Sequence, residues 1–304
     1  MPSYDNCSIC DSSKIVCRFK LADFDVLQCM DCTVYQLARI PSEKELETLY
    51  SDDYYEERSE YYFNNSIWDP ENGRVDENID SFRKALRRIR DEQPEGRTLL
   101  DVGCGIGIFL SMAREEGWDV KGIDVSEYAV NHARDHFGLD VHHGSNLKDA
   151  PFEPDSFDVI TLWDSIEHFR DPCDQMAQVR CLLKPGGLMM LDTPNGCSLM
   201  RSLANLSYKA TLGGFKYPVQ KLYHRFHLFY YTPKAMKTLI QKTEYERIVI
   251  DFGRIPIVKA RGTSLEKFLV RIFSHLERFT GKPFEIFVLA RKPNGTAPQQ
   301  AGVT

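Results

Sequence analysis

The sequence predicts an α/β fold, a doubly wound and mostly parallel sheet of seven strands, preceded by a small N-terminal zinc ribbon. From residue 98 onward, short apolar segments alternate with helical segments, a pattern typical of parallel sheets flanked by helices. Before that point, two Cys-x-x-Cys pairs occur within the first 32 residues. A length of 304 residues accommodates one large domain or two smaller ones.

Residues 1–40 are expected to form the zinc ribbon. Two residues separate the cysteines of each pair, so both thiolates of a pair can face one ion, and two pairs complete a tetrahedron. Four protein ligands leave no open coordination position, which makes the zinc structural and not catalytic. The alternative is a set of free or redox-active thiols. The expected ligands are Cys7, Cys10, Cys29 and Cys32, and the expected strands between the pairs are 15–19 and 25–28.

Two helices are expected between the ribbon and the sheet. The first covers residues 41–50, since Ser42 and Glu45 have the spacing of a capping box. The second covers residues 75–92, where apolar residues at helical spacing define one face. A tyrosine-rich acidic stretch over residues 50–63 separates them and has no clear periodicity.

The seven strands follow in order, with helices expected after the first, the second and the fourth. Apolar runs bounded by turn residues mark the strands, and a cap at Ser126 marks the start of one helix. A Lys-Pro-Gly-Gly turn at residues 184–187 precedes the fifth strand. The expected strands are 98–102, 119–124, 140–143, 157–163, 188–192, 246–251 and 285–290, and the expected helices are one that ends at 116 and those at 126–137 and 174–183.

A glycine turn follows the first strand and opens a helix. Its glycines, Gly103, Gly105 and Gly107, allow a tight turn and let a ligand reach backbone N–H groups. A dinucleotide fingerprint needs its third glycine at position 108, which is Ile108, so the turn suits a smaller nucleoside ligand. Asp124 ends the second strand, where an acid accepts hydrogen bonds from ribose hydroxyls. The alternative is a tight turn beside an ordinary surface acid.

The chain resembles the seven-stranded S-adenosylmethionine (SAM)-dependent methyltransferases over residues 96–292. The motifs that carry the resemblance lie at 99–107, 122–126, 149–158, 163–168 and 183–187. More narrowly, the ribbon, residues 50–55 and residues 227–233 resemble a bacterial and archaeal subgroup whose members modify sugars, glycans or other small molecules.

The resemblance implies a Rossmann-like fold with a final antiparallel strand beside the fifth, and SAM as cofactor. It implies a methyltransferase domain over 96–292 that carries a lid insertion at about 197–232. A helical connector at 41–95 would cover the active site, and residues 293–304 would form a disordered tail.

The resemblance also assigns a cofactor site. Asp124 would bind the ribose hydroxyls. Asn146 stands where the family has Asp, and its amide oxygen can still accept a bond from the adenine amino group. Trp163 and Asp164 would border the sulfonium and the acceptor, although Trp163 is equally suited to be a core ring. The implied residues are Asp101, Gly103, Cys104, Gly105, Gly107, Asp124, Val125, Asn146, Leu147, Trp163 and Asp164.

Methyl transfer needs a nucleophile held in line with the sulfonium methyl and a base that removes its proton. His168 is the first candidate base, since it is expected near the start of a short helix, whose N-terminus disfavours a charged imidazole. His224 and His227 are the other candidates. The alternative for His168 is a hydrogen bond to a loop. Asp164, Glu167 and His168 also resemble the metal-contacting cluster of some quinone O-methyltransferases, which gives a divalent cation as a further expectation.

Residues 193–243 contain no acidic residue although the whole chain has a net charge of −6. This asymmetry predicts an anionic acceptor such as a nucleotide sugar or glycan intermediate, with Arg225 as the best phosphate ligand. The alternative is a solvated lid. An apolar stripe that includes Leu203 and Leu206 suits lid core, a dimer contact or a membrane-surface element. The basic residues are Arg201, Lys209, Lys216, Lys221, Arg225, Lys234, Lys237 and Lys242.

The leading function is therefore methyl transfer to an oxygen of a sugar, nucleotide sugar or glycan intermediate. The alternatives are a quinone- or phenol-type O-methyltransferase, an RNA or protein methyltransferase that uses the ribbon as substrate reader, and an inactive binding scaffold. The net charge of −6 argues against bulk nucleic-acid binding. With no apolar run of about 18 residues and no secretion signal, we expect no transmembrane segment and a cytoplasmic location. The sequence is compatible with a monomer or an oligomer.

Overall fold

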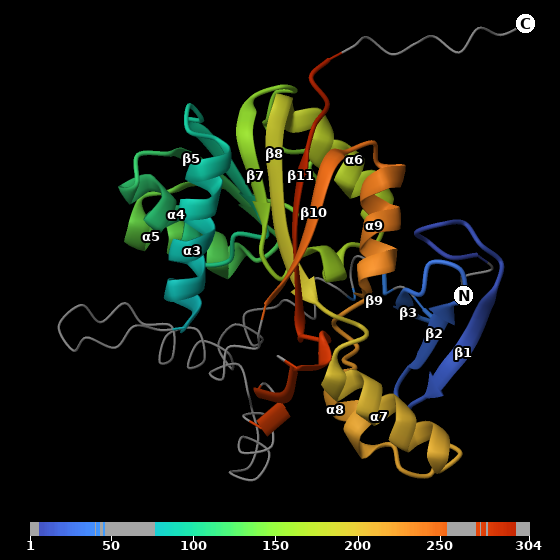
Figure 1. Ribbon diagram of the computed structural model, residues 1–304. Helices are drawn as coiled ribbons and strands as arrows, with labels where there is room; N and C mark the ends of the chain where they lie inside the picture. Colours follow the sequence, from blue (N-terminus) through green and yellow to red (C-terminus); the bar gives the residue numbers. More distant parts are fainter. Residues whose placement is uncertain are drawn as a thin grey trace, which may run out of the picture.

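The expected seven-stranded sheet is confirmed in the computed structural model, which describes residues 6–39, 41–42, 45, 77–253, 272–273, 275–277 and 279–295 (Figure 1). Strand β11 pairs antiparallel with both of its neighbours, and the five strands from β8 to β6 are mutually parallel. The spatial order is β10 (Glu246–Gly253), β11 (Glu285–Arg291), β8 (Leu183–Pro194), β7 (Phe157–Leu162), β4 (Thr98–Val102), β5 (Asp119–Asp124) and β6 (Asp140–His143).

Helices cover both faces of this sheet (Figure 1). Successive side chains of a strand point to opposite faces, so Leu99 joins one apolar cluster and Leu100 the other. The cluster of Leu99 includes α3 (Glu77–Glu92), α4 (Ile108–Glu115) and α5 (Glu127–Phe137), and that of Leu100 includes α6 (Pro172–Leu182) and α9 (Pro233–Lys242).

Several element boundaries differ from the expectation by a few residues, and two of the differences have a local cause. Helix α6 begins two residues earlier, because Asp171 caps it by accepting a hydrogen bond from the backbone N–H of Asp174. The turn at residues 184–187 lies inside β8, where the pairing with β7 shifts between the partners of Phe157 and Val159. Gly186 permits this break because its φ is +74°.

The ribbon is joined to the large domain by a shared sheet. Its strands β1 (Ile15–Lys20), β2 (Asp25–Cys29) and β3 (Tyr35–Leu37) pair in order, and β9 (Phe229–Tyr230) of the large domain adds to β3 as a fourth antiparallel strand. Strands β3 and β9 were not expected from the sequence. One apolar cluster contains residues of both parts, so the ribbon does not have a separate core.

Two helices follow the carboxyl end of β8 inside the expected lid region. They are α7 (Leu199–Ala210), capped by Ser198, and α8 (Tyr217–Leu222), and they lie at the lower end of the molecule in Figure 1. Across the described ranges, each helix is too short or too polar to cross a lipid bilayer.

Several expectations fall on residues that the structure describes in part or not at all. The capping box of the first connector helix is confirmed, since Ser42 Oγ accepts from the N–H of Glu45 and Glu45 Oε2 accepts from the N–H of Ser42. The tyrosine-rich stretch at 50–63 and the tail beyond residue 295 lie outside the described residues.

Candidate functional site

The glycine turn leaves the carboxyl end of β4 in a conformation that favours glycine. The φ angles of Gly103, Gly105 and Gly107 are +80°, +53° and +87°. A Cβ atom on Gly103 would collide with Ser165 Oγ, whereas a Cβ on Gly105 would meet no heavy atom within 4 Å. The backbone at Gly103 therefore packs against Ser165, whereas there is open space beside the backbone at Gly105. A turn that binds a ligand through its backbone N–H groups requires such open space.

Asp124 holds this turn at the end of β5. Its Oδ2 accepts a hydrogen bond from the N–H of Gly105 at 2.8 Å, and its Oδ1 accepts from the N–H of Ser126 at 2.9 Å. Burial raises the pKa of the Asp124 carboxyl, and the two N–H donors oppose that shift. Each carboxylate oxygen has a second lone pair, so Asp124 can also accept a bond from a ligand hydroxyl.

Asp101 lies beneath the turn, at the carboxyl end of β4. Its side chain is 1% exposed, and its Oδ1 accepts a hydrogen bond from Thr161 Oγ1 at 2.7 Å. Burial raises the pKa of Asp101 to about 7, against the effect of the Thr161 bond, and the nearby charge of Asp124 adds to the rise. Asp101 therefore supports the turn from inside the fold.

The remaining implied cofactor residues lie along the same edge of the sheet. Cys104 points into the core, where its Sγ packs beside Gly122. Asn146 is half-buried; its amide nitrogen donates to Asp149 Oδ2 and its amide oxygen accepts from the N–H of Lys148. The neighbouring Leu147 is buried, and Val125 is half-buried after β5.

Trp163 belongs to an aromatic cluster with rings from two helices. Its ring centroid is 5.0 Å from that of Phe109 in α4 and 5.8 Å from that of Phe82 in α3. These contacts match the alternative of a core ring. The indole Nε1 of Trp163 is buried and has no hydrogen-bond partner among the described residues.

The structure brings together Glu167, His168 and His227. One ligand atom from each lies within 4.8 Å of the others, and the two imidazole rings meet edge to face with centroids 4.8 Å apart. Glu167 is fully buried, and its Oε2 accepts a hydrogen bond from Thr193 Oγ1 at 2.9 Å. A carboxylate and two imidazoles in this arrangement can take up a proton or bind a metal ion.

The expected reason for the neutrality of His168 is wrong. His168 ends the 3₁₀ turn Ile166–His168 and does not begin a helix. It therefore has no helix N-terminus beside it that would disfavour a positive charge on the imidazole. Instead, its Nδ1 lies 2.8 Å from the carbonyl oxygen of Phe226. A carbonyl only accepts, so Nδ1 carries the proton in the neutral ring, and Nε2 has the lone pair.

Two other expected site residues lie differently. Asp164 is exposed, with a φ of +46°, and is absent from the Glu167–His168–His227 group. His224 is exposed, with its ring 5.7 Å from that of His227, and its backbone N–H donates to the hydroxyl of Tyr230. Of the three candidate bases, the structure therefore places His168 and His227 together.

Arg201 does not take part in an exposed basic lid. It is 2% exposed, and its guanidinium donates to the carbonyl oxygens of Asn195 and Leu222. The guanidinium also lies over the rings of Tyr230 and Phe284, at 5.1 and 4.6 Å. Arg201 therefore anchors α7 and cannot meet an acceptor phosphate.

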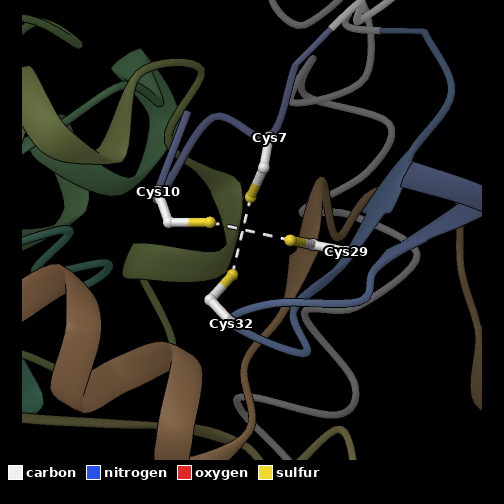
Figure 2. A group of neighbouring side chains, drawn as sticks. All are labelled: Cys7, Cys10, Cys29 and Cys32. Atoms are coloured by element: carbon white, nitrogen blue, oxygen red, sulfur yellow. Dashed lines mark hydrogen bonds between the residues drawn. The ribbon is translucent and has the colours of Figure 1, made fainter. Parts of the chain in front are cut away.

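The four ribbon cysteines converge on one point, as Figure 2 shows. The Sγ atoms of Cys7 and Cys32 are 3.5 Å apart, and those of Cys10 and Cys29 are 3.6 Å apart. A tetrahedral ZnS₄ centre with 2.3 Å bonds separates its sulfur atoms by about 3.8 Å, so the four residues fit a zinc ion. A hydrogen bond between Cys7 and Cys32 lowers the pKa of Cys7 and raises that of Cys32.

Three contacts of the site were not expected from the sequence. Thr193 binds Glu167, Phe226 orients His168, and Asp192 Oδ1 accepts from the N–H of Asp164. Thr193 and Asp192 lie at the carboxyl end of β8, an edge where parallel sheets bind ligands, and that position was a usable signal. The contact at Phe226 uses its backbone carbonyl, which every residue has, so the identity of the residue could not predict this contact.

A parallel sheet with one inserted antiparallel strand, a glycine turn after β4 and an acid at the end of β5 define a class I SAM-dependent methyltransferase domain. The methyltransferase domain family matches residues 75–249, more than half of the chain. The chain belongs to that family.

The curated relatives share part of this domain. The chain is 36% identical over 105 residues to a ubiquinone biosynthesis O-methyltransferase of Aromatoleum aromaticum, which covers 33% of this chain and 45% of the relative. It is 37% identical over 116 residues to a protein of the same name from Thiobacillus denitrificans, 36% of this chain and 50% of the relative. The chain thus spans about half the length of the curated relatives it matches.

Solved structures share the fold at low sequence identity. A SAM-dependent methyltransferase of Thermotoga maritima, described as a possible histamine N-methyltransferase, has a TM-score of 0.54 and 15% identity, over 81% of this chain and 99% of that one. A phosphoethanolamine N-methyltransferase of Haemonchus contortus has a TM-score of 0.54 and 18% identity, over 90% of this chain and 70% of that one. At such identities, the likeness concerns the fold alone.

Proposed function

We propose that this protein transfers the methyl group of SAM to a hydroxyl oxygen of a phenol- or quinone-type small molecule. The observation that carries the proposal is the Glu167–His168–His227 group, at the edge of the sheet where the open glycine turn also lies. The name of the curated relatives supports a phenolic acceptor over the anionic sugar expected from the sequence. The burial of Arg201 removes one of the cations on which the sugar expectation rested.

In this proposal, the open side of Gly105 receives the cofactor and Asp124 binds the ribose hydroxyls. SAM supplies an electrophilic methyl group with a good leaving group. The protein then has to hold the acceptor oxygen in line with that methyl, exclude water and remove the hydroxyl proton.

His168 is the proposed base. The carbonyl of Phe226 holds the proton of His168 on Nδ1, so that Nε2 can accept the proton of the acceptor hydroxyl. The edge-to-face ring of His227 and the carboxylate of Glu167 stabilise the imidazolium that forms.

A divalent cation is the competing proposal for the same three residues. Their ligand atoms are within 4.8 Å of one another, and one carboxylate with two imidazoles suits Mn²⁺ or Zn²⁺. A bound cation would act as a Lewis acid that lowers the pKa of an acceptor hydroxyl. Nε2 of His168 cannot bind an ion and remove a proton at once, so the two proposals exclude each other.

A methyl-transfer assay tests the proposed function. Purified protein and labelled SAM are incubated with catechols, prenylated phenols, nucleotide sugars and glycans, and product is measured without added metal and with Mn²⁺ or Zn²⁺. We expect methylated phenols. Transfer to nucleotide sugars alone would restore the sugar proposal, and a requirement for added metal would favour the cation over the free base.

A substitution tests whether His168 acts in catalysis or only supports the folded structure. We expect His168→Gln to lower kcat by 10²–10⁴-fold, the usual contribution of a positioned base, with an unchanged affinity for S-adenosylhomocysteine. The matched control is His136→Gln, which changes an exposed histidine of α5 that stacks on His132.

We also propose that the cysteine cluster holds one structural zinc ion. The support is the agreement between the sulfur separations and a ZnS₄ tetrahedron. Elemental analysis of protein purified without chelator should give one zinc per chain. Cys32→Ser should lose the metal, whereas Cys181→Ser, which changes an exposed cysteine outside the cluster, should retain it.

A further inference from the structure

Exposed apolar side chains gather at one end of the molecule. In α7, α8 and the turn between them, five large apolar residues are at least 41% exposed, and Leu212 reaches 97%. The helical residues 272–273, 275–277 and 279–280 add three more at the spacing of one helix face, with Phe279 at 79%. The eight are Leu203, Leu206, Leu212, Phe215, Tyr217, Ile272, Leu276 and Phe279.

These two segments lie side by side. The N–H of Leu199, at the start of α7, donates to the carbonyl of Lys282, and the buried Arg201 of α7 lies over the ring of Phe284. Figure 1 places both segments at the lower end of the molecule, beyond the carboxyl end of β8. The eight side chains therefore lie on neighbouring segments at one end of the molecule, which we call the apolar end.

Among the described residues, the charges around the apolar end are mostly basic. Lys209 and Lys221 are exposed beside it, Lys216 is half-exposed, and Lys282 is exposed where the second segment ends. Residues 193–243 have eight basic and no acidic residues, in a chain with a net charge of −6. Within the described part of 272–284, Glu277 is the one acid, and it is 2% exposed.

The ribbon strand β1 borders this surface without reversing its charge. Phe19 of β1 packs edge to face on Tyr208 of α7. Arg18 and Lys20 of β1 are exposed there, and they offset the acids at the next turn, Asp23 and Asp25.

We propose that the apolar end attaches the protein to the surface of an anionic lipid bilayer. Leu206, Leu212 and Phe215 enter the boundary between headgroups and acyl chains, and the lysines bind the lipid phosphates. An apolar surface ringed by cations matches this interface, in which apolar chains lie directly beneath negative charge. The attachment does not depend on the identity of the acceptor. It would place the carboxyl edge of the sheet, with its site, next to the bilayer.

Vesicle sedimentation tests the attachment. Full-length wild-type protein is mixed with phosphatidylcholine vesicles, with or without 30% phosphatidylglycerol, at 50 and 300 mM salt. We expect binding to the anionic vesicles that weakens at least fivefold at high salt, because screening reduces the lysine contribution. Equal binding to both kinds of vesicle, or no binding, would overturn the proposal.

Two variants and a control locate the surface. The triple variant Leu206→Ser, Leu212→Ser, Phe215→Ser and the charge variant Lys209→Glu, Lys216→Glu, Lys221→Glu should each lower the vesicle affinity at least tenfold. The control Met30→Ser, Val249→Ser, Phe252→Ser removes three large apolar side chains that are 42–53% exposed elsewhere on the protein, and it should bind as wild type does. All substituted apolar residues are exposed, so circular dichroism and S-adenosylhomocysteine binding should match wild type.

A second copy of the chain is the other occupant that the test detects. Analytical ultracentrifugation of the wild type and of the apolar triple variant measures the oligomeric state. A wild-type dimer that becomes monomeric in the triple variant, together with no vesicle binding, would assign the apolar end to self-association and overturn the bilayer proposal.

Discussion

Gly105 and Gly103 differ in the space beside their backbone. The φ of Gly105 is positive, and a methyl group added there would meet no protein atom within 4 Å. Gly103 differs, since its Cβ would collide with Ser165. The open position at Gly105 is thus available for a cofactor, and the closed one at Gly103 is a packing constraint.

Gly105→Ala should weaken cofactor binding with a small loss of stability. The left-handed backbone costs an L-residue roughly 1 kcal/mol, and the new methyl group occupies cofactor space. Gly117→Ala is the matched control, because Gly117 also has a positive φ, +88°, and no atom within 4 Å of its Cβ. Calorimetry should show a tenfold or greater loss of S-adenosylhomocysteine affinity in the first variant alone. Equal affinities in both variants would contradict the proposed cofactor position.

Asp101 makes stability depend on pH. Its folded pKa of about 7 lies above the ordinary value of 3.8, so the folded state holds a proton that the unfolded state releases. The stability that this proton provides is complete below pH 4, falls as the pH rises to about 7, and then stays level. At roughly 1.4 kcal/mol per pH unit, the loss between pH 5.5 and 7 is about 2 kcal/mol.

Asp101→Asn should abolish this part of the pH dependence, since its amide oxygen still accepts the Thr161 bond. Urea unfolding of cofactor-free protein from pH 5.5 to 8.5 measures the difference between wild type and variant. Parallel curves over that range would show that Asp101 is ionised in the folded protein throughout.

At the scale of elements, β9 connects the ribbon with the histidine pair. The knuckle that ends at Cys32 leads into Thr33, whose hydroxyl bonds to that of Thr232 at 2.6 Å. Strand β3 then pairs with β9, and the N–H of Leu228 donates to the carbonyl of Glu167. The segment between α8 and β9, which contains His227, is therefore held from the ribbon side and from the sheet side.

Loss of the ribbon metal should loosen this connection. In Cys32→Ser we expect faster amide hydrogen exchange over residues 226–232 and at least a tenfold fall in kcat, because His168 depends on the Phe226 carbonyl for its orientation. The S-adenosylhomocysteine affinity should stay within about twofold, since the glycine turn follows β4 of the seven-stranded sheet and the ribbon strands belong to the other sheet. Cys181→Ser should change none of these. Unchanged exchange in Cys32→Ser would mean that β9 holds its position without the metal.

At the scale of the whole molecule, the two parts share one core. The apolar cluster on the α6 and α9 face contains Val26 and Val34 of the ribbon together with Leu239 and Val288 of the large domain. Parts that share a core lose their packing together. The chain should therefore unfold in one transition although it contains two recognisable units.

Two probes test this cooperativity in the zinc-bound protein. In a Trp68→Phe background, fluorescence of Trp118 and Trp163 reports the large domain, and a chromogenic chelator reports release of the ribbon metal on heating. We expect coincident midpoints. Zinc release that precedes the fluorescence change by several degrees would show that the ribbon unfolds separately.

The sequence alone determined the sheet, the glycine turn with Asp124, and the cysteine cluster. Each of these is set by local spacing: strand and helix periodicity, a turn that requires glycine, and cysteine pairs two residues apart. The tertiary structure decided the addition of β9 to the ribbon, the meeting of His168 with His227, and the burial of Arg201. These depend on contacts between segments far apart in the chain, such as Phe226 with His168, and several use backbone groups that every residue has. Local sequence patterns do not encode such contacts, because packing of the whole fold selects them.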